Sequence, residues 1–145
     1  MDKILSFLFK AVNVEPRYDE GLCLAVNRPG SCTACRDACP HDAIRITKSV
    51  EIDEVDCTGC GLCVHACPSG ALEPKVNYER GASLRCSRVK GSAQSVVCLG
   101  RLQGSDLLRL VGGGEGITLA RGDCSTCPIG SAAVITAIEE ARAEA

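Results

Sequence analysis

Four cysteines between residues 57 and 67 follow the spacing C-x2-C-x2-C-x3-C and are followed directly by proline. They are Cys57, Cys60, Cys63, Cys67 and then Pro68. Sliding the sequence against itself by 28 residues places an earlier copy on this run, with Cys32, Cys35, Cys39 and Pro40. Three cysteines this close together predict a tight loop around one metal centre, with backbone N–H groups pointing at the sulfurs. The repeat therefore predicts two such loops.

The composition favours metal centres over disulfides. The chain has 12 cysteines in 145 residues but only four aromatic residues, two Phe and two Tyr. Aromatic side chains therefore cannot supply most of the buried area of its core, and metal centres or disulfides have to stabilise it instead. Residues 1–12 make a poor secretory signal, and no apolar run approaches the length of a membrane span. We therefore expect a cytoplasmic protein without a membrane span, and in a reducing compartment clustered cysteines usually bind metal.

Residues 22–75 resemble the bacterial dicluster ferredoxins in cysteine motif, internal repeat and a predicted hairpin. The hairpin has strands at 44–46 and 50–52 around a turn at 47–49. The resemblance implies two 4Fe-4S clusters, an electron-carrier role and short helical turns after Cys35 and Cys63. It also implies crossed ligation, in which the last cysteine of each motif binds the other cluster. One cluster then lies on Cys39, Cys57, Cys60 and Cys63.

The first copy of the motif departs from the family pattern. Pro29 stands where the repeat requires cysteine, and Cys23 is the nearest cysteine upstream. A loop of eight residues that contains Pro29 and Gly30 can bring Cys23 back to the cluster. The other cluster would then lie on Cys23, Cys32, Cys35 and Cys67. The alternative is that Cys23 is a free buried thiol and the cluster is 3Fe-4S or has a ligand other than cysteine.

The second half carries four further cysteines at wider spacing: Cys86, Cys98, Cys124 and Cys127. Hydrophobic patterns predict strands at 84–87, 95–99 and 117–120. They also predict a helix at 105–111, capped by Ser105 or Asp106, and a last helix that starts at Pro128 or Ser131. We expect a small α/β layer, with the cysteines at strand ends and before the last helix. The glycine-rich stretch 112–116 reads as a turn.

These four cysteines allow three interpretations. Zinc ribbons usually have two C-x2-C pairs, and only Cys124 and Cys127 form one. A thioredoxin-like dithiol at that pair would leave Cys86 and Cys98 without a role. A third iron–sulfur cluster uses all four, and the absence of a tight three-cysteine loop favours 2Fe-2S over 4Fe-4S.

Short strings in the second half also resemble the delta subunit of methyl-viologen-reducing hydrogenase. They are Cys98-Leu99-Gly100-Arg101, Leu107-Leu108, Gly116-Ile117 and Gly122-Asp123-Cys124. The resemblance implies a 2Fe-2S cluster that passes electrons between a hydrogenase or dehydrogenase and another subunit. The histidine that this family has near the last cysteines is absent here, which places its ligand set in doubt.

The histidines and the N-terminus complete the site predictions. His41 and His65 each lie beside a ligand cysteine and are read as surface residues that can only tune a cluster. Residues 1–12 have apolar residues at helical spacing and predict a short amphipathic helix, packed on its own domain or on a partner.

Together these patterns predict an α+β protein with three parts. Residues 1–20 form the N-terminal helix and linker, 21–75 the dicluster ferredoxin domain, and 76–145 a small α/β domain with a third metal site. The predicted function is electron transfer, as a subunit or partner of a larger oxidoreductase of the hydrogenase or dehydrogenase type. The alternative is an iron–sulfur redox sensor.

The charge and the missing catalytic groups narrow the role further. No acid–base pair or open metal site is visible, so we expect no substrate chemistry of its own. The formal charge of −2 falls to about −8 with three clusters bound, which disfavours nucleic acid and favours a redox protein as partner.

Overall fold

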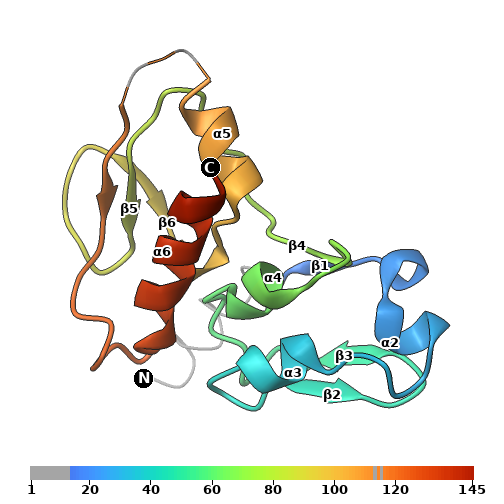
Figure 1. Cartoon of the computed structure of the whole chain (residues 1–145). Coiled ribbons are helices and arrows are strands. Elements are labelled where there is room, and N and C mark those ends of the chain that lie inside the picture. The colour runs from blue at the N-terminus through green and yellow to red at the C-terminus, as the bar shows by residue number, and fades with distance from the viewer. Residues whose placement is uncertain (1–13, 113, 115) are drawn as a thin grey trace.

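The computed structural model describes residues 14–112, 114 and 116–145 (Figure 1). The predicted N-terminal helix falls on residues outside this part of the chain. The first half contains β1 (Arg17–Tyr18), η1 (Glu20–Leu22), α2 (Leu24–Asn27), α3 (Ala34–Ala38), β2 (Ile44–Ile46), β3 (Val50–Ile52), α4 (Leu62–Ala66) and β4 (Leu72–Glu73). The second half contains β5 (Leu84–Cys86), β6 (Gln94–Val96), η2 (Leu99–Arg101), α5 (Gly104–Leu110), β7 (Leu119–Ala120) and α6 (Ala133–Glu144). No helix of the described residues is both long and apolar enough to cross a bilayer.

Two antiparallel strand pairs organise the first half. The predicted hairpin is present as β2 and β3, with Ile44 opposite Ile52 and Ile46 opposite Val50. A second pair, β1 with β4, was not predicted and places Tyr18 opposite Leu72. This pair brings the two ends of the first half together, because it joins the segment before the first cysteine to the segment after the second repeat.

The second half is a small α/β unit. Its three strands are parallel in the order β6-β5-β7, and α5 packs against α6. The guanidinium of Arg85 holds the short β5–β6 connection by donating to the carbonyl oxygens of Ala93 (3.0 Å) and Val89 (2.7 Å). The predicted strands are present but shorter: β5 ends at Cys86, β6 ends at Val96, and β7 begins only at Leu119.

The helices of the second half begin at different residues than the sequence predicted. Gln103, not Ser105 or Asp106, is the N-cap of α5, and its backbone N–H donates to the Asp106 carboxylate at 3.0 Å. The last helix begins at Ala133, after both predicted start points, and Cys124 and Cys127 lie in the loop before it.

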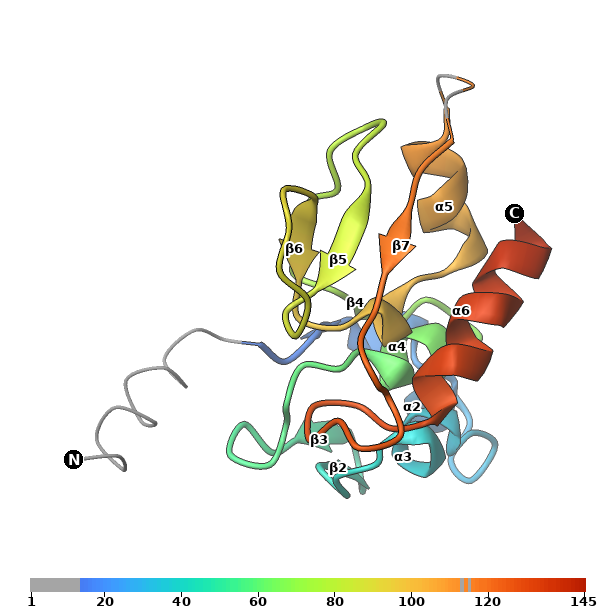
Figure 2. The same ribbon diagram turned by 90° about the vertical axis from the view of Figure 1, so that its left-hand side faces the viewer.

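One hydrophobic core joins the two halves. It contains Cys60 and Leu62 of the first half together with Leu99 and Val134 of the second. Figure 2 shows α4 beside η2 and α6, and these three elements are in contact. The first half also has a core of its own around Val50 and other buried residues of its strands and helices. The halves are therefore not independent globules on a flexible linker.

Gly61 lies at a close contact between the two halves. Its φ is +77°, and a Cβ atom placed there would overlap the side chain of Arg101. Gly70 has a similar φ of +70° but has open space around it.

These two glycines allow a matched test of the contact between the halves. Gly70→Ala should cost about 1–2 kcal/mol, the strain of a left-handed backbone carrying a Cβ atom. Gly61→Ala should cost clearly more, because η2 must also move away. Urea unfolding of the iron-loaded protein measures both. Equal losses would mean that the contact between Gly61 and Arg101 contributes nothing to stability.

Candidate metal centres

The twelve cysteines gather around three separate cavities. Each cavity is lined by four cysteines, and none is shared. The first cavity is lined by Cys23, Cys32, Cys35 and Cys67, the second by Cys39, Cys57, Cys60 and Cys63, and the third by Cys86, Cys98, Cys124 and Cys127. These are the three sets that the sequence predicted, including the exchange of Cys39 and Cys67 between the two motifs. All twelve are free thiols.

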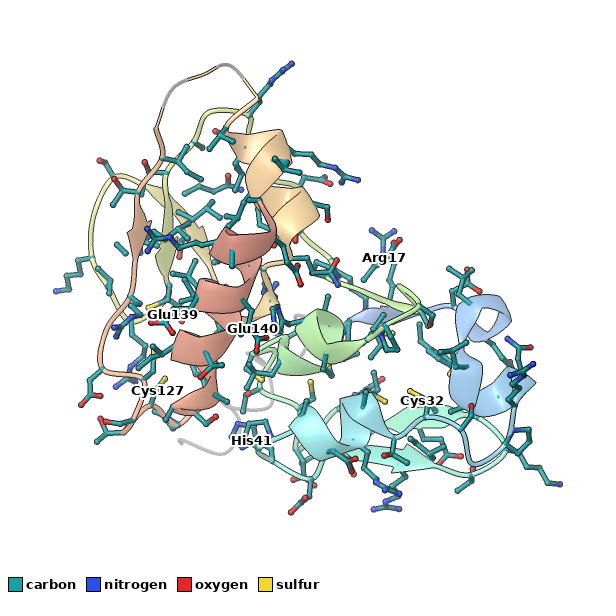
Figure 3. The ribbon with its side chains drawn as sticks, viewed as in Figure 1. Arg17, Cys32, His41, Cys127, Glu139 and Glu140 are labelled. Carbon is teal, nitrogen blue, oxygen red and sulfur yellow. The ribbon has the colours of Figure 1, made fainter. Side chains whose placement is uncertain are left out.

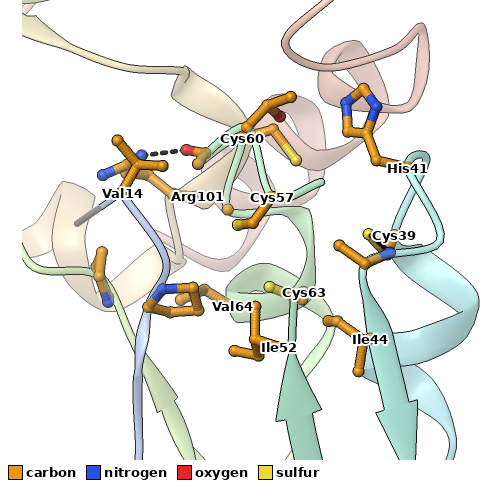
Figure 4. A pocket seen from close by; sticks show the side chains of 16 residues that line it. Val14, Cys39, His41, Ile44, Ile52, Cys57, Cys60, Cys63, Val64 and Arg101 are labelled. Atoms are coloured by element: carbon orange, nitrogen blue, oxygen red, sulfur yellow. Dashed lines mark hydrogen bonds between the residues drawn. The ribbon is translucent and has the colours of Figure 1, made fainter. Parts of the chain in front are cut away.

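The second cavity lies between the two repeats (Figure 4). Cys57 and Cys60 come from the loop before α4, and Cys63 from the first turn of α4. Cys39 ends α3, and its sulfur accepts a hydrogen bond from the backbone N–H of Ala43 at 3.4 Å. Because α3 packs against α4, the fourth sulfur of one motif reaches the three sulfurs of the other.

The first cavity includes Cys23 despite the unusual spacing. Cys23 lies between η1 and α2 and is only 7% exposed. The amide of Asn27 donates to the Cys23 carbonyl oxygen at 2.9 Å, which fixes the backbone at this residue. Tyr18 lines the same cavity, and its buried hydroxyl makes no well-formed hydrogen bond within the described part of the chain. Burial and the nearby Cys23 raise the pKa of Tyr18, so this hydroxyl stays protonated and can donate.

The third cavity is assembled from strand ends and a loop. Cys86 ends β5, Cys98 is the N-cap of η2, and Cys124 and Cys127 lie in the loop before α6. The backbone N–H of Gly100 donates to the Cys98 sulfur at 3.4 Å. A Cβ atom on Gly130 would approach that sulfur to 3.4 Å, so a larger residue there would narrow the cavity.

The buried thiols are poorly suited to carry charge without a metal. Burial raises the pKa of Cys63 to about 12, and the neighbouring Cys60 and Cys57 add to the rise. Burial raises the pKa of Cys98 to about 11. Backbone N–H groups act in the opposite direction: those of Gly130 and Ile129 hold the pKa of Cys127 below its ordinary value. Four thiolates can therefore share such a cavity only around positively charged metal.

These residues fit iron–sulfur clusters in three respects. The donors are four sulfurs per cavity, backbone N–H groups point at several of them, and a buried hydroxyl without a good acceptor lies beside Cys23. In the described residues no group of three or more His, Cys, Asp or Glu is arranged to hold a single metal ion. A cluster places inorganic sulfur between its irons, so its cysteines stand further apart than the ligands of one ion.

Both histidines bridge the two halves, and the prediction that they are surface residues was wrong. Nε2 of His41 donates to the Ile129 carbonyl oxygen at 2.7 Å. Nδ1 of His65 donates to the Leu102 carbonyl oxygen at 2.8 Å, and Nε2 lies 2.8 Å from a Glu140 carboxylate oxygen. Figure 3 shows His41 and Glu140 at the junction.

The charge of His65 follows from its partners. Burial lowers its pKa, but the hydrogen bonds to Glu140 and Leu102 outweigh that effect, and the pKa lies above its ordinary value. Local sequence gives no sign of these contacts, because their partners lie 37 to 88 residues away along the chain.

The three cavities have a definite spatial order. Figure 3 shows Cys32 and Cys127 at opposite ends of the molecule. The second cavity lies between them: it shares the α3–α4 contact with the first, and it meets the third at Gly130. A Cβ atom on that glycine would lie 3.4 Å from the sulfur of Cys98 and 3.9 Å from the Cβ atom of Cys60.

Known proteins share the first half most clearly. The 4Fe-4S dicluster domain family matches residues 30–71, a stretch that begins after Cys23. A ferredoxin of Methanothermococcus thermolithotrophicus is 41% identical over 46 residues, which cover 30% of this chain and 77% of that protein. The chain therefore belongs to the ferredoxin family through its 4Fe-4S dicluster domain.

Two larger relatives are also similar. One subunit of an ion-translocating oxidoreductase complex from Methanosarcina acetivorans is 49% identical over 43 residues, covering 29% of this chain and 16% of that protein. The polyferredoxin-like subunit of an aliphatic sulfonate oxidoreductase from Pyrococcus furiosus is 32% identical over 97 residues, covering 61% of this chain and 54% of that subunit. The chain thus spans about a sixth of the first and about half of the second. The second match is too long to fit within residues 1–71 and extends into the second half.

Replacing Cys23 by Ser should damage only the cluster of the first cavity. The set at Cys39, Cys57, Cys60 and Cys63 does not include Cys23 and should survive. Iron analysis and low-temperature EPR of the anaerobically purified variant measure this. Unchanged iron content and unchanged spectra would show that Cys23 is not a ligand.

Cys39→Ser is the matched control for the exchange between motifs. Although Cys39 belongs to the same motif as Cys32 and Cys35, its loss should damage the second cluster and spare the first. Loss of the first cluster in this variant would contradict the crossed arrangement.

Proposed function

We propose that the chain is an iron–sulfur electron-transfer protein with three redox centres, acting as a ferredoxin-like subunit or partner of a larger cytoplasmic oxidoreductase. The observation that carries this proposal is the sorting of all twelve cysteines into three cavities of four. Relatives named as a ferredoxin and as a polyferredoxin-like oxidoreductase subunit support it. Each cluster, when bound, accepts and returns one electron at a time.

The ligands of the proposed centres follow from the cavities. The first and second cavities hold 4Fe-4S clusters, each on its four cysteines. The third holds a 2Fe-2S cluster on Cys86, Cys98, Cys124 and Cys127. Its support is the wide spacing of these residues and their position in an α/β unit, together with the short strings of this half that resemble the delta subunit of methyl-viologen-reducing hydrogenase.

The two halves of the chain hold different redox centres. Residues 21–75 form the dicluster domain and 76–145 the domain of the third centre, and the core around Cys60 and Leu62 keeps the two at a fixed separation. Electrons then pass in the order first, second and third centre, or the reverse. We expect the donor and the acceptor to be redox proteins or other subunits, with the substrate chemistry carried out by them.

The protein around the clusters keeps water away from them and adjusts their reduction potentials. Buried side chains such as Leu62 and Val134 exclude water between the second and third cavities. Backbone N–H groups at the sulfurs, such as those of Ala43 and Gly100, stabilise negative charge there.

The fully loaded full-length protein should contain about ten irons, from two 4Fe-4S clusters and one 2Fe-2S cluster. Iron and zinc analysis after anaerobic reconstitution measures the count. A 4Fe-4S cluster in the third cavity would give about twelve irons, and this result would correct the cluster type but keep three redox centres. A free dithiol would give about eight irons, and zinc would give about eight irons with one zinc. Either of these results would remove the third centre.

A double variant locates the additional irons. Cys86→Ser with Cys127→Ser should lower the count to about eight and leave the EPR signals of the two 4Fe-4S clusters unchanged. A count that stays at the wild-type value would place the additional irons elsewhere.

A further inference from the structure

Arg101 is the single buried charged side chain among the described residues, at 6% exposure. Its Nε donates to the carbonyl oxygen of Cys98 at 3.1 Å, and its Nη2 donates to the carbonyl oxygen of Gly59. Figure 4 shows the bond to Gly59 beside the second cavity. Neither acceptor carries a charge. The ion pairs of the described part of the chain join other residues, so the guanidinium has no carboxylate partner there.

Burying a charge without a partner of opposite sign lowers the stability of the fold. Removing a guanidinium from water costs several kcal/mol, and hydrogen bonds to two carbonyl oxygens offset only part of this cost. Proteins seldom retain such a charge unless a group of opposite sign lies close by. No carboxylate of the described residues forms an ion pair with Arg101, so the missing negative charge has to come from another source.

The position of Arg101 identifies that source. The residue lines the second cavity, and it follows Cys98 of the third cavity by three positions. Burial raises the pKa of Cys60 and of Cys98, and Arg101 is a positive charge that opposes the rise at both. Gly61 has no side chain where the Cβ atom and the backbone of Arg101 pack against it, and the hydrogen bonds to Cys98 and Gly59 hold the guanidinium in place.

We propose that Arg101 is the internal counterion shared by the second and third centres, and that it raises the reduction potentials of both. This inference rests on the proposed function. Reduction adds negative charge to a cluster, and a fixed positive charge nearby stabilises the reduced form more than the oxidised form. Arg101 lines the second cavity and hydrogen-bonds to Cys98 of the third, but it neither lines the first cavity nor hydrogen-bonds to a cysteine there, so the potential of the first cluster should not depend on it.

The same contacts could be purely structural, since Arg101 ties the loop at Gly59 to the second half. A charge role and a structural role predict different results for two substitutions. Arg101→Met removes the charge and both hydrogen bonds, whereas Arg101→Lys keeps the charge and changes the geometry of the bonds. Arg85→Met is the matched control, because Arg85 also donates to two backbone carbonyl oxygens, those of Ala93 and Val89, but lines none of the three cavities.

The test is an anaerobic redox titration of the full-length, iron-loaded protein, followed by EPR. At the wild-type midpoint of the second cluster, Arg101→Met should lower the ratio of reduced to oxidised cluster about tenfold, equivalent to about 59 mV for one electron. The third centre should shift in the same direction, and the first should stay at its wild-type potential. Arg101→Lys should recover most of the shift, and Arg85→Met should show none.

Several outcomes would overturn the proposal. They are an unchanged potential of the second cluster in Arg101→Met, equal shifts in the Met and Lys variants, and equal shifts of all three centres. If Arg101→Met does not retain the second cluster, Arg101→Gln replaces it, since glutamine keeps a donor without the charge. A wild-type protein without iron in the third cavity would refute that part of the proposed function, and the second cluster would still test Arg101.

Discussion

The structure depends on how negative charge on buried sulfur is neutralised. Cysteines occupy places in both hydrophobic cores where other small proteins have aromatic side chains. Burial and the neighbouring thiols raise the pKa of Cys63 to about 12, so the second cavity resists ionisation until a metal enters. Folding and metal binding are therefore linked, because the iron that completes the core also makes its thiolates possible.

Sequence spacing was sufficient for features that depend on nearby residues. The hairpin of β2 and β3 and the short helices α3 and α4 follow from alternation and from the cysteine motif, and the structure confirms them. The resemblance to dicluster ferredoxins implied which cysteines of the first half would gather, and even Cys23 lines the expected cavity despite Pro29. Whether these cysteines bind iron remains a prediction.

Contacts between distant segments could not be read from the sequence. His41 and His65 looked like surface residues because nothing near them in the chain shows that Ile129 and Leu102 will face them. The sequence gives Arg101 no role beyond its place in the string that begins at Cys98, and only the structure shows that it is buried against Gly61. Pairing of β1 with β4 was missed for the same reason, since two-residue strands carry no periodic signal.

The central claim is that three iron–sulfur centres lie in a row, with the second between the other two. X-ray diffraction from crystals of the anaerobically purified full-length protein, measured on both sides of the iron absorption edge, tests it most directly. The account predicts iron density in all three cysteine cavities, with the sulfur of Cys23 bonded in the first and those of Cys86 and Cys127 in the third. Iron confined to the first two cavities, or a zinc ion at Cys124 and Cys127, would contradict it.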